Sequence, residues 1–478
     1  MQHAFEFVQI QLIIPMQPRL RATQPHDPTM KQHPQVMQAI RRELSDWRLW
    51  SVRAVVMGFA VLAGLTVVLF TWLTEQALEA FHGLQHLAWW SPLLWTPLGT
   101  AAVVWLTRRF AAGAAGSGIP QVMAALTPGL PAPASAWFVS LRLTLAKMLL
   151  TASGLLCGLS LGREGPSVQI AAGVMHSARR FLKPGGPVSE QGLLIAGGAA
   201  GIAAAFNTPL GGIMFAIEEL SRKPEQRSNG LIMAAIVLSG LMAVSVYGNA
   251  TYFGVIRPGA VDLALLGPAL AVAGVAGLAG GLFSRLMVAS LSMASGDVFT
   301  RWRRAYPVRF AAGCGLAVAV MGLASDGATF GSGYQHTRGL LEGPQDANPL
   351  YVLLKFMATW VTSWSGVPGG IFAPSLAIGA GIGNDLAQWL HPAQASTLIA
   401  LGMAGFLAAA TQAPLTAFII VMEMVDGHGL VLSLMASALV ASAVSRLISL
   451  PLYASLAHLQ WLRLPEGLRG RGEAAPSA

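Results

Sequence analysis

The chain has 478 residues, of which 54% are hydrophobic and only 11% are charged, and its mean hydropathy is +0.58. The charged share is about half of that in an average soluble domain, so the composition argues against a water-soluble globular fold. The net charge of +9 comes from short basic clusters beside apolar runs, a pattern typical of membrane-protein inner loops and not of a nucleic-acid-binding surface. These clusters are Arg108–Arg109, Arg179–Lys183, Arg222–Arg227 and Arg301–Arg309.

The two ends of the chain are polar. Residues 1–33 are rich in Pro and Met, and we expect them to be disordered, with Met30 as an alternative start. Residues 35–50 carry apolar side chains at helical spacing, which predicts an amphipathic helix on the cytoplasmic face of a membrane. Residues 464–478 form a short polar tail. We therefore expect one transmembrane domain over residues 34–463.

Apolar runs of about 20 residues, the length of a transmembrane helix, recur between these ends. They lie at or near Ala54–Leu73, Gly192–Ile217, Leu231–Tyr247, Leu263–Leu282 and Leu430–Val444. The 53 glycines and 28 prolines indicate close helix contacts and helices that stop inside the membrane. We predict an all-α polytopic membrane protein. Thr74–Trp90 holds Glu75 and Glu79 but no Lys or Arg, so we place it outside and the N-terminus inside.

Little in the sequence indicates metal or enzymatic chemistry. Cys157 and Cys314 lie in apolar surroundings and the ten histidines form no cluster at ligand spacing, so we expect no disulfide, metal site or cofactor. An intramembrane hydrolase would need a nucleophile and a base, and Ser160 with His176 is the one pair near each other in sequence. No oxyanion or nucleophile motif accompanies this pair, so we do not expect an enzyme.

Two halves of the chain carry the same elements in the same order, at about 51–250 and 264–450. In the first half, GREGPS at 162–167 is followed by AAFNTPL at 204–210 and then by Glu218. In the second half, GIFAPS at 370–375 is followed by AATQAPL at 409–415 and then by Glu423. Duplicated halves with interrupted helices at matching positions are typical of secondary transporters whose binding site lies between the repeats. The apolar runs alone leave the relative orientation of the halves open.

Three segments combine a glycine-rich backbone with a proline at the first turn of an apolar helix: Gly116–Pro120, Gly162–Pro166 and Gly369–Pro374. Proline at a helix start sacrifices no hydrogen bond, and glycine lets the preceding backbone turn its N–H groups toward a ligand. Converging helix N-termini would hold a dehydrated anion without a buried cation, and Ser117 adds a hydroxyl donor. Ordinary kinks or packing glycines are the alternative for each segment taken alone.

Glu164 lies inside the second of these segments, and a carboxylate within the membrane is costly unless it has a function. At a helix N-terminus a carboxylate takes the place of an anion, so it competes with the anion while charged and withdraws when protonated. This exchange would link proton binding to anion release. A structural Glu164 paired with the neighbouring Arg163 is the alternative.

Other charged residues have weaker signals. One carboxylate of Glu218–Glu219 could collect protons from the cytoplasmic side, but the residues alone favour capping or an interfacial salt bridge for this pair. Glu423 lies at a helix end, where a structural cap is the favoured interpretation. Lys147 and Arg142 precede Glu164 in an apolar segment and would either attract anions or extend to an interface.

Together, these segments resemble the CLC family of chloride channels and proton-coupled chloride transporters, over residues 50–462. The four signatures of that family are matched by GSGIP at 116–120, GREGP at 162–166, GIFAP at 370–374 and a tyrosine near the C-terminus, Tyr453. The resemblance implies two inverted repeats of tilted and broken helices, and a homodimer with one pathway per subunit. The tail after residue 463 is short, so we expect no C-terminal nucleotide-binding module of the kind found in many eukaryotic members, which fits a bacterial protein.

The resemblance also implies roles for individual residues. Glu164 would be the gating glutamate and Glu219 the internal proton-transfer glutamate, whose presence favours an exchanger over a passive channel. The chloride site would comprise the hydroxyls of Ser117 and Tyr453, the backbone at Ile371 and Phe372, and the motif residues Gly118, Arg163 and Gly165. The serine in GSGIP resembles the residue found at this position in the chloride-selective members of the family.

The family's acids after GSGIP are Gln121 and Met123 here, so any structural role of those acids is absent. We expect a chloride/proton antiporter of the bacterial inner membrane, in contact with lipid, with both termini cytoplasmic. A passive voltage- or pH-gated chloride channel is the alternative.

Overall fold

The computed structural model describes residues 46–183, 185–221, 229–248, 251–256, 263–293, 296–343 and 348–468. Four of the predicted segments lie wholly or mostly outside these residues: the N-terminal segment 1–33, the amphipathic helix before residue 46, the basic cluster at 222–227 and the tail after residue 468. The chain divides into residues 1–50 and 51–478, and the fold described below is that of the second unit.

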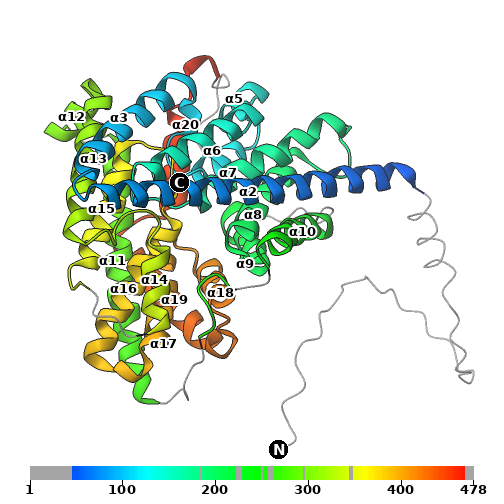
Figure 1. Ribbon diagram of the computed structural model, residues 1–478. Coiled ribbons are helices and arrows are strands. Elements are labelled where there is room, and N and C mark those ends of the chain that lie inside the picture. Colours follow the sequence, from blue (N-terminus) through cyan, green and yellow to red (C-terminus); the bar gives the residue numbers. More distant parts are fainter. Residues whose placement is uncertain are drawn as a thin grey trace, which may run out of the picture. The chain divides into compact units, whose positions relative to one another are not determined.

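Helices follow one another along the whole unit (Figure 1). The first half holds α2 (Trp47–Leu87), α3 (Pro92–Phe110), α4 (Ile119–Ala125), α5 (Ala132–Phe138), α6 (Leu141–Leu156), α7 (Glu164–Ser177), α8 (Glu190–Phe206), α9 (Pro209–Phe215) with the π-helical turn η3 (Ala216–Leu220), and α10 (Asn229–Tyr247). The second half holds α11 (Leu266–Ser292), α12 (Val298–Ala305), α13 (Pro307–Ala324), α14 (Tyr334–Glu342), α15 (Tyr351–Ser365), α16 (Phe372–Leu390), α17 (Ala395–Thr411), α18 (Pro414–Met424), α19 (Val431–Arg446) and α20 (Leu452–Leu462). The prediction of an all-α fold is confirmed.

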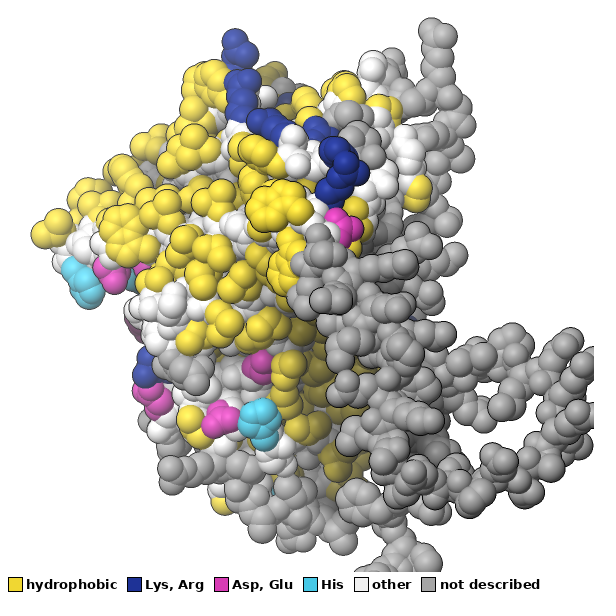
Figure 2. Space-filling view, turned by 90° about the vertical axis from the view of Figure 1, so that its right-hand side faces the viewer, with side chains coloured by type: hydrophobic (Ala, Val, Ile, Leu, Met, Phe, Trp, Pro, Cys, Tyr) yellow, Lys and Arg dark blue, Asp and Glu magenta, His cyan; other side chains and the backbone are white. Residues whose placement is uncertain are grey.

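Seven helical stretches of the described residues are long and apolar enough to cross a membrane: Trp47–Leu87, Pro133–Leu156, Gly230–Tyr247, Leu266–Ser292, Pro307–Ala324, Pro392–Thr411 and His428–Arg446. The chain is therefore a multi-pass membrane protein. Hydrophobic side chains cover much of the face in Figure 2, and Lys and Arg side chains gather along its upper edge. This division matches an apolar lipid-facing surface bordered by a polar interface.

The predicted apolar run Gly192–Ile217 is not one helix. α8 ends at Phe206, Asn207 takes the left-handed conformation with φ 57°, and α9 begins at Pro209. Gln412, with φ 61°, separates α17 from α18 in the same way. A left-handed residue ends a helix, and a proline at the first helical position starts the next one without losing a hydrogen bond.

The two repeats meet directly at their signature segments. Gly162 and Gly370 exchange two backbone hydrogen bonds of 2.8 Å, an isolated antiparallel bridge. Further out, α16 and α17 approach so closely that a Cβ atom on Gly379 would lie 2.3 Å from the carbonyl oxygen of Gly402. This contact confirms the prediction that glycines permit close helix packing.

The structure adds a repeated element that the motif search missed. Gly116-Ser-Gly118 before α4 has a counterpart, Gly331-Ser-Gly333, before α14, and all four glycines have positive φ angles. A fully buried lysine holds each loop: Lys147 donates to two carbonyls of the first, and Lys355 to those of Thr329 and Gly331. The second loop escaped notice because no proline follows it.

Candidate functional site

Glu164 opens helix α7 and is completely buried. Its carboxylate faces the backbone amides of Arg163, Glu164 and Ala373, but neither oxygen has a hydrogen-bond partner among the residues that the structure describes. Ala373 belongs to the first turn of α16, so the carboxylate lies between the N-termini of α7 and α16. Both helix ends present unpaired N–H groups and partial positive charge to this position.

Two hydroxyl groups lie close to the start of α7. Ser117 precedes α4, and a Cβ atom on Gly165 would lie only 2.4 Å from its Oγ. Tyr453, in the first turn of α20, is beside Ser117 because α20 packs against α4. Ser117 is 9% and Tyr453 1% exposed, and within the described part of the chain neither hydroxyl makes a hydrogen bond. Two buried donors without partners are the feature expected of a ligand site.

Other residues predicted for the chloride site also lie at these helix starts, but the backbone N–H of Gly118 is already hydrogen-bonded. Ile371 and Phe372 form the start of α16, and Gly165 adjoins Ser117. The Gly118 N–H, however, donates to Oε1 of Gln121 at 2.9 Å, so as placed it is not available to an anion. Gln121 thus braces the loop where the family has an acid, because its amide group also donates to the carbonyl of Ala115 at 2.5 Å.

Lys147 holds the loop of Ser117 by hydrogen bonds to its backbone. Its side chain is fully buried, and Nζ donates to the carbonyls of Ala114 at 2.8 Å and Gly116 at 2.5 Å. The interpretation in which Lys147 extends to an interface is therefore wrong, whereas Arg142 is exposed at the start of α6. The two hydrogen bonds of Lys147 hold the loop of Ser117 in place.

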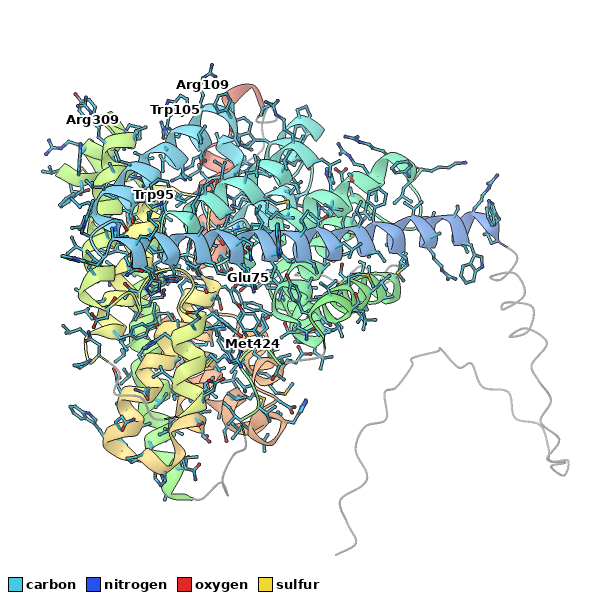
Figure 3. The ribbon with its side chains drawn as sticks, viewed as in Figure 1. Glu75, Trp95, Trp105, Arg109, Arg309 and Met424 are labelled. Atoms are coloured by element: carbon cyan, nitrogen blue, oxygen red, sulfur yellow. The ribbon has the colours of Figure 1, made fainter. Side chains whose placement is uncertain are left out.

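Arg163 does not pair with its neighbour Glu164. Its Nη1 atom forms an ion pair with Oε1 of Glu75 on α2, at 2.7 Å. Figure 3 labels Glu75 along this helix. The ion pair favours the gate interpretation of Glu164 over the structural one, because the nearest cation is engaged elsewhere.

A cavity of about 330 Å³ reaches Ser117 and Ile371 from one side of the protein. Arg108, Arg303, Arg304 and Arg463 line it. Three of these arginines donate to carbonyls at the C-terminal end of α11: Arg303 to Ser290 at 3.0 Å, Arg304 to Met293 at 2.8 Å and Arg463 to Leu291 at 2.5 Å. The wall of the cavity is therefore positively charged, which favours the entry of anions.

This cavity was not predicted, because membrane topology alone accounts for basic clusters at the ends of apolar runs. Two of those clusters, at 108–109 and 301–309, supply three of the four arginines. Both clusters lie at the ends of apolar helices that flank a glycine-rich loop, and this position was the sequence feature that could have predicted the cavity.

The two neighbouring carboxylates Glu218 and Glu219 make different contacts. Glu218 accepts the backbone N–H groups of Leu415 at 3.1 Å and Thr416 at 2.6 Å, and so caps α18. Glu219, which is half-buried, is electrostatically coupled to Tyr453. Glu423 in turn caps α9 through the N–H groups of Leu210 and Gly211. The capping interpretations of Glu218 and Glu423 are confirmed, and Glu219 is left as the candidate for proton transfer.

The residues considered for hydrolysis contact other groups. The Ser160 hydroxyl is 2.9 Å from that of Thr359, and His176 pairs with Glu190. In the described part of the chain, no group of three or more His, Cys, Asp or Glu side chains is placed to hold a metal ion.

Comparison with known proteins adds to this geometry. Residues 98–446 match the family model described as voltage gated chloride channel. The H⁺/Cl⁻ exchange transporter ClcA of Cronobacter sakazakii is 31% identical over 427 residues, which cover 83% of this chain and 87% of that protein. The chain belongs to the CLC family.

Solved CLC structures share the fold. A slow cyanobacterial Cl⁻/H⁺ antiporter superimposes with a TM-score of 0.77 at 24% identity, covering 87% of this chain and 99% of the other. A CLC-type fluoride/proton antiporter gives 0.71 at 21% identity, with 86% and 99% covered. A eukaryotic CLC transporter gives 0.68 at 22% identity, with 86% and 74% covered. The CLC fold, with its two inverted repeats of tilted and broken helices, is thereby established for this chain.

Proposed function

We propose that this CLC protein is a chloride/proton antiporter in which Glu164 is the gate. The observation that carries the proposal is a buried carboxylate without hydrogen-bond partners in the described residues, at two helix N-termini and beside two unpartnered hydroxyls. The 31% identity to a protein named as an H⁺/Cl⁻ exchange transporter supports the same assignment.

In this mechanism chloride enters through the arginine-lined cavity and binds between the hydroxyls of Ser117 and Tyr453 and the start of α16. Helix-end interactions of about 0.3–2 kcal/mol each favour entry and still permit exit. The charged Glu164 carboxylate competes for the helix ends next to this site. Protonation removes its negative charge, and the side chain then leaves the position to the anion.

Glu219 would deliver protons from the cytoplasmic side, and the arginine-lined cavity would open to that side. We infer this orientation from the basic residues that cluster there: Arg109 and Arg309 lie at the same edge in Figure 3. The protein would then lie in a bacterial inner membrane with both termini in the cytoplasm. We also propose a homodimer with an independent pathway in each subunit, and transport without an enzymatic reaction.

The test is proton uptake by proteoliposomes that contain the purified protein, driven only by an imposed chloride gradient. We expect uphill proton movement with the wild type, its loss in Glu164→Gln and Glu219→Gln, and continued chloride flux in Glu219→Gln. Chloride flux without proton movement in the wild type would instead identify a passive channel, with Glu219 as a structural residue.

A further inference from the structure

The ion pair between Glu75 and Arg163 lies next to the gate but is not part of the proposed transport steps. The Arg163 side chain is 14% exposed and that of Glu75 is 44% exposed, so the pair is partly shielded from water. Arg163 forms the N-cap of α7 and Glu164 its first residue, so the guanidinium that binds Glu75 is attached directly before the gate.

Arg163 lies between two carboxylates of unequal accessibility. It is electrostatically coupled to both Glu75 and Glu164, but its ion pair is formed with Glu75. Side chains of adjacent helical residues point in different directions, which keeps the guanidinium off Glu164 while Glu75 binds it. Without Glu75, the Glu164 carboxylate would be the acceptor next to a buried guanidinium, and Arg–carboxylate pairs are among the strongest hydrogen-bonded contacts.

We propose that Glu75 is a positioning residue, which holds the Arg163 guanidinium away from Glu164 and so sets the acidity at which the gate opens. This inference rests on the proposed gating role of Glu164. It assigns a function to a carboxylate on α2, far from the signature motifs in the sequence.

Three tyrosines near the two carboxylates stay neutral over the relevant range, and Glu219 acts on Tyr453 and not on Arg163. Tyr247 and Tyr252 adjoin Glu75 and Arg163, and Tyr453 adjoins Glu164. Tyrosine ordinarily titrates near pH 10, so these three remain neutral between about pH 4 and 8. Lys147, on α6, is bound to the carbonyls before α4. Arg163 is therefore the charge whose movement would act on the gate.

The sign of the effect follows from the gate. Charged Glu164 blocks the anion position, so chloride flux rises as the pH falls. If Arg163 moves to Glu164, it stabilises the charged form, and more acid is required to open the gate. A neighbouring guanidinium shifts a carboxyl titration downward by about 1–3 pH units, and we expect Glu75→Gln to lower the midpoint of the flux–pH curve by about one unit.

The experiment measures chloride efflux from proteoliposomes as a function of external pH. Glu75→Asp keeps the charge on a shorter side chain and should retain a midpoint near that of the wild type. Glu79→Gln is the matched control, because Glu79 is an exposed carboxylate one turn further along α2 that contacts Gln76. Its curve should superimpose on that of the wild type. Should Glu75→Gln not fold, Glu75→Ser allows the same comparison.

The same substitution in a Glu164→Gln background decides whether the effect passes through the gate. We expect no shift there, because the titrating group is gone. A Glu75→Gln curve that coincides with the wild type, or a shift that persists in the Glu164→Gln background, overturns the inference. Proton uptake by the wild type, measured in parallel, tests the antiporter separately: a channel gated by Glu164 would lack the uptake and still show the shift.

Discussion

The two carboxylates that join α9 and α18 allow a quantitative stability prediction. The helices run antiparallel, and each one caps the other: Glu423 accepts N–H groups at 3.1 and 2.7 Å, and Glu218 accepts N–H groups at 3.1 and 2.6 Å. In Glu423→Gln one oxygen remains an acceptor, but the other becomes an NH₂ group that faces a backbone N–H. A hydrogen bond to a charged group contributes about 1.5–3 kcal/mol, so we expect the free energy of unfolding to fall by about 2–3 kcal/mol.

The assay is denaturant- or heat-induced unfolding of the purified protein in detergent, followed by circular dichroism. Glu218→Gln should have a similar effect, because its two hydrogen bonds have nearly the same lengths. The double variant should lose less than the sum of the single losses, since both caps hold one helix pair. Glu342→Gln is the control: it removes an exposed i,i+4 pair with Arg338, which contributes about 0.3–0.5 kcal/mol. Wild-type stability in Glu423→Gln, or an equal loss in Glu342→Gln, would refute the reasoning.

Two further predictions concern the candidate anion site. Ser117→Ala and Tyr453→Phe each remove one unpartnered hydroxyl, and each should weaken chloride binding about fivefold, because a hydrogen bond contributes about 1 kcal/mol. Isothermal titration with chloride measures this affinity, and an unchanged value would contradict the prediction. Lys147→Met should reduce both chloride affinity and thermal stability, since it removes two hydrogen bonds that hold the loop of Ser117. Arg142→Gln, at an exposed position, should change neither. Equal behaviour of these two variants in titration and thermal unfolding would contradict the role assigned to Lys147.

Much of the site could be predicted because its elements are local in sequence. A glycine-rich turn followed by proline predicts a helix N-terminus, and a lone carboxylate such as Glu164 within an apolar segment indicates a candidate functional position. The convergence of three such turns was predicted from the resemblance of all three segments to one family. The bridge between Gly162 and Gly370 shows how the convergence is achieved, by direct backbone pairing of the two repeats.

The contacts that could not be predicted join residues far apart in the chain. Glu75 and Arg163 pair across 88 positions, and Glu423 caps a helix more than 200 positions away. Such pairs leave no local pattern, because each partner alone is an ordinary charged residue at a helix end. Hydropathy alone shows a single run across the break at Asn207, because apolar residues continue on both sides of it, and only the repeated element AAFNTPL marks the position.

Positive charge around the candidate anion site is held one layer behind it. Lys147 binds two carbonyls and Arg163 binds Glu75, so neither basic side chain is directed between the hydroxyls of Ser117 and Tyr453. A cation in direct contact, at low dielectric, would hold a halide too tightly for rapid release, while its field from a second layer still favours entry. The same arrangement leaves Glu164 without a cationic partner. In the proposed gate, protonation would therefore displace the carboxylate from the helix ends without breaking an ion pair.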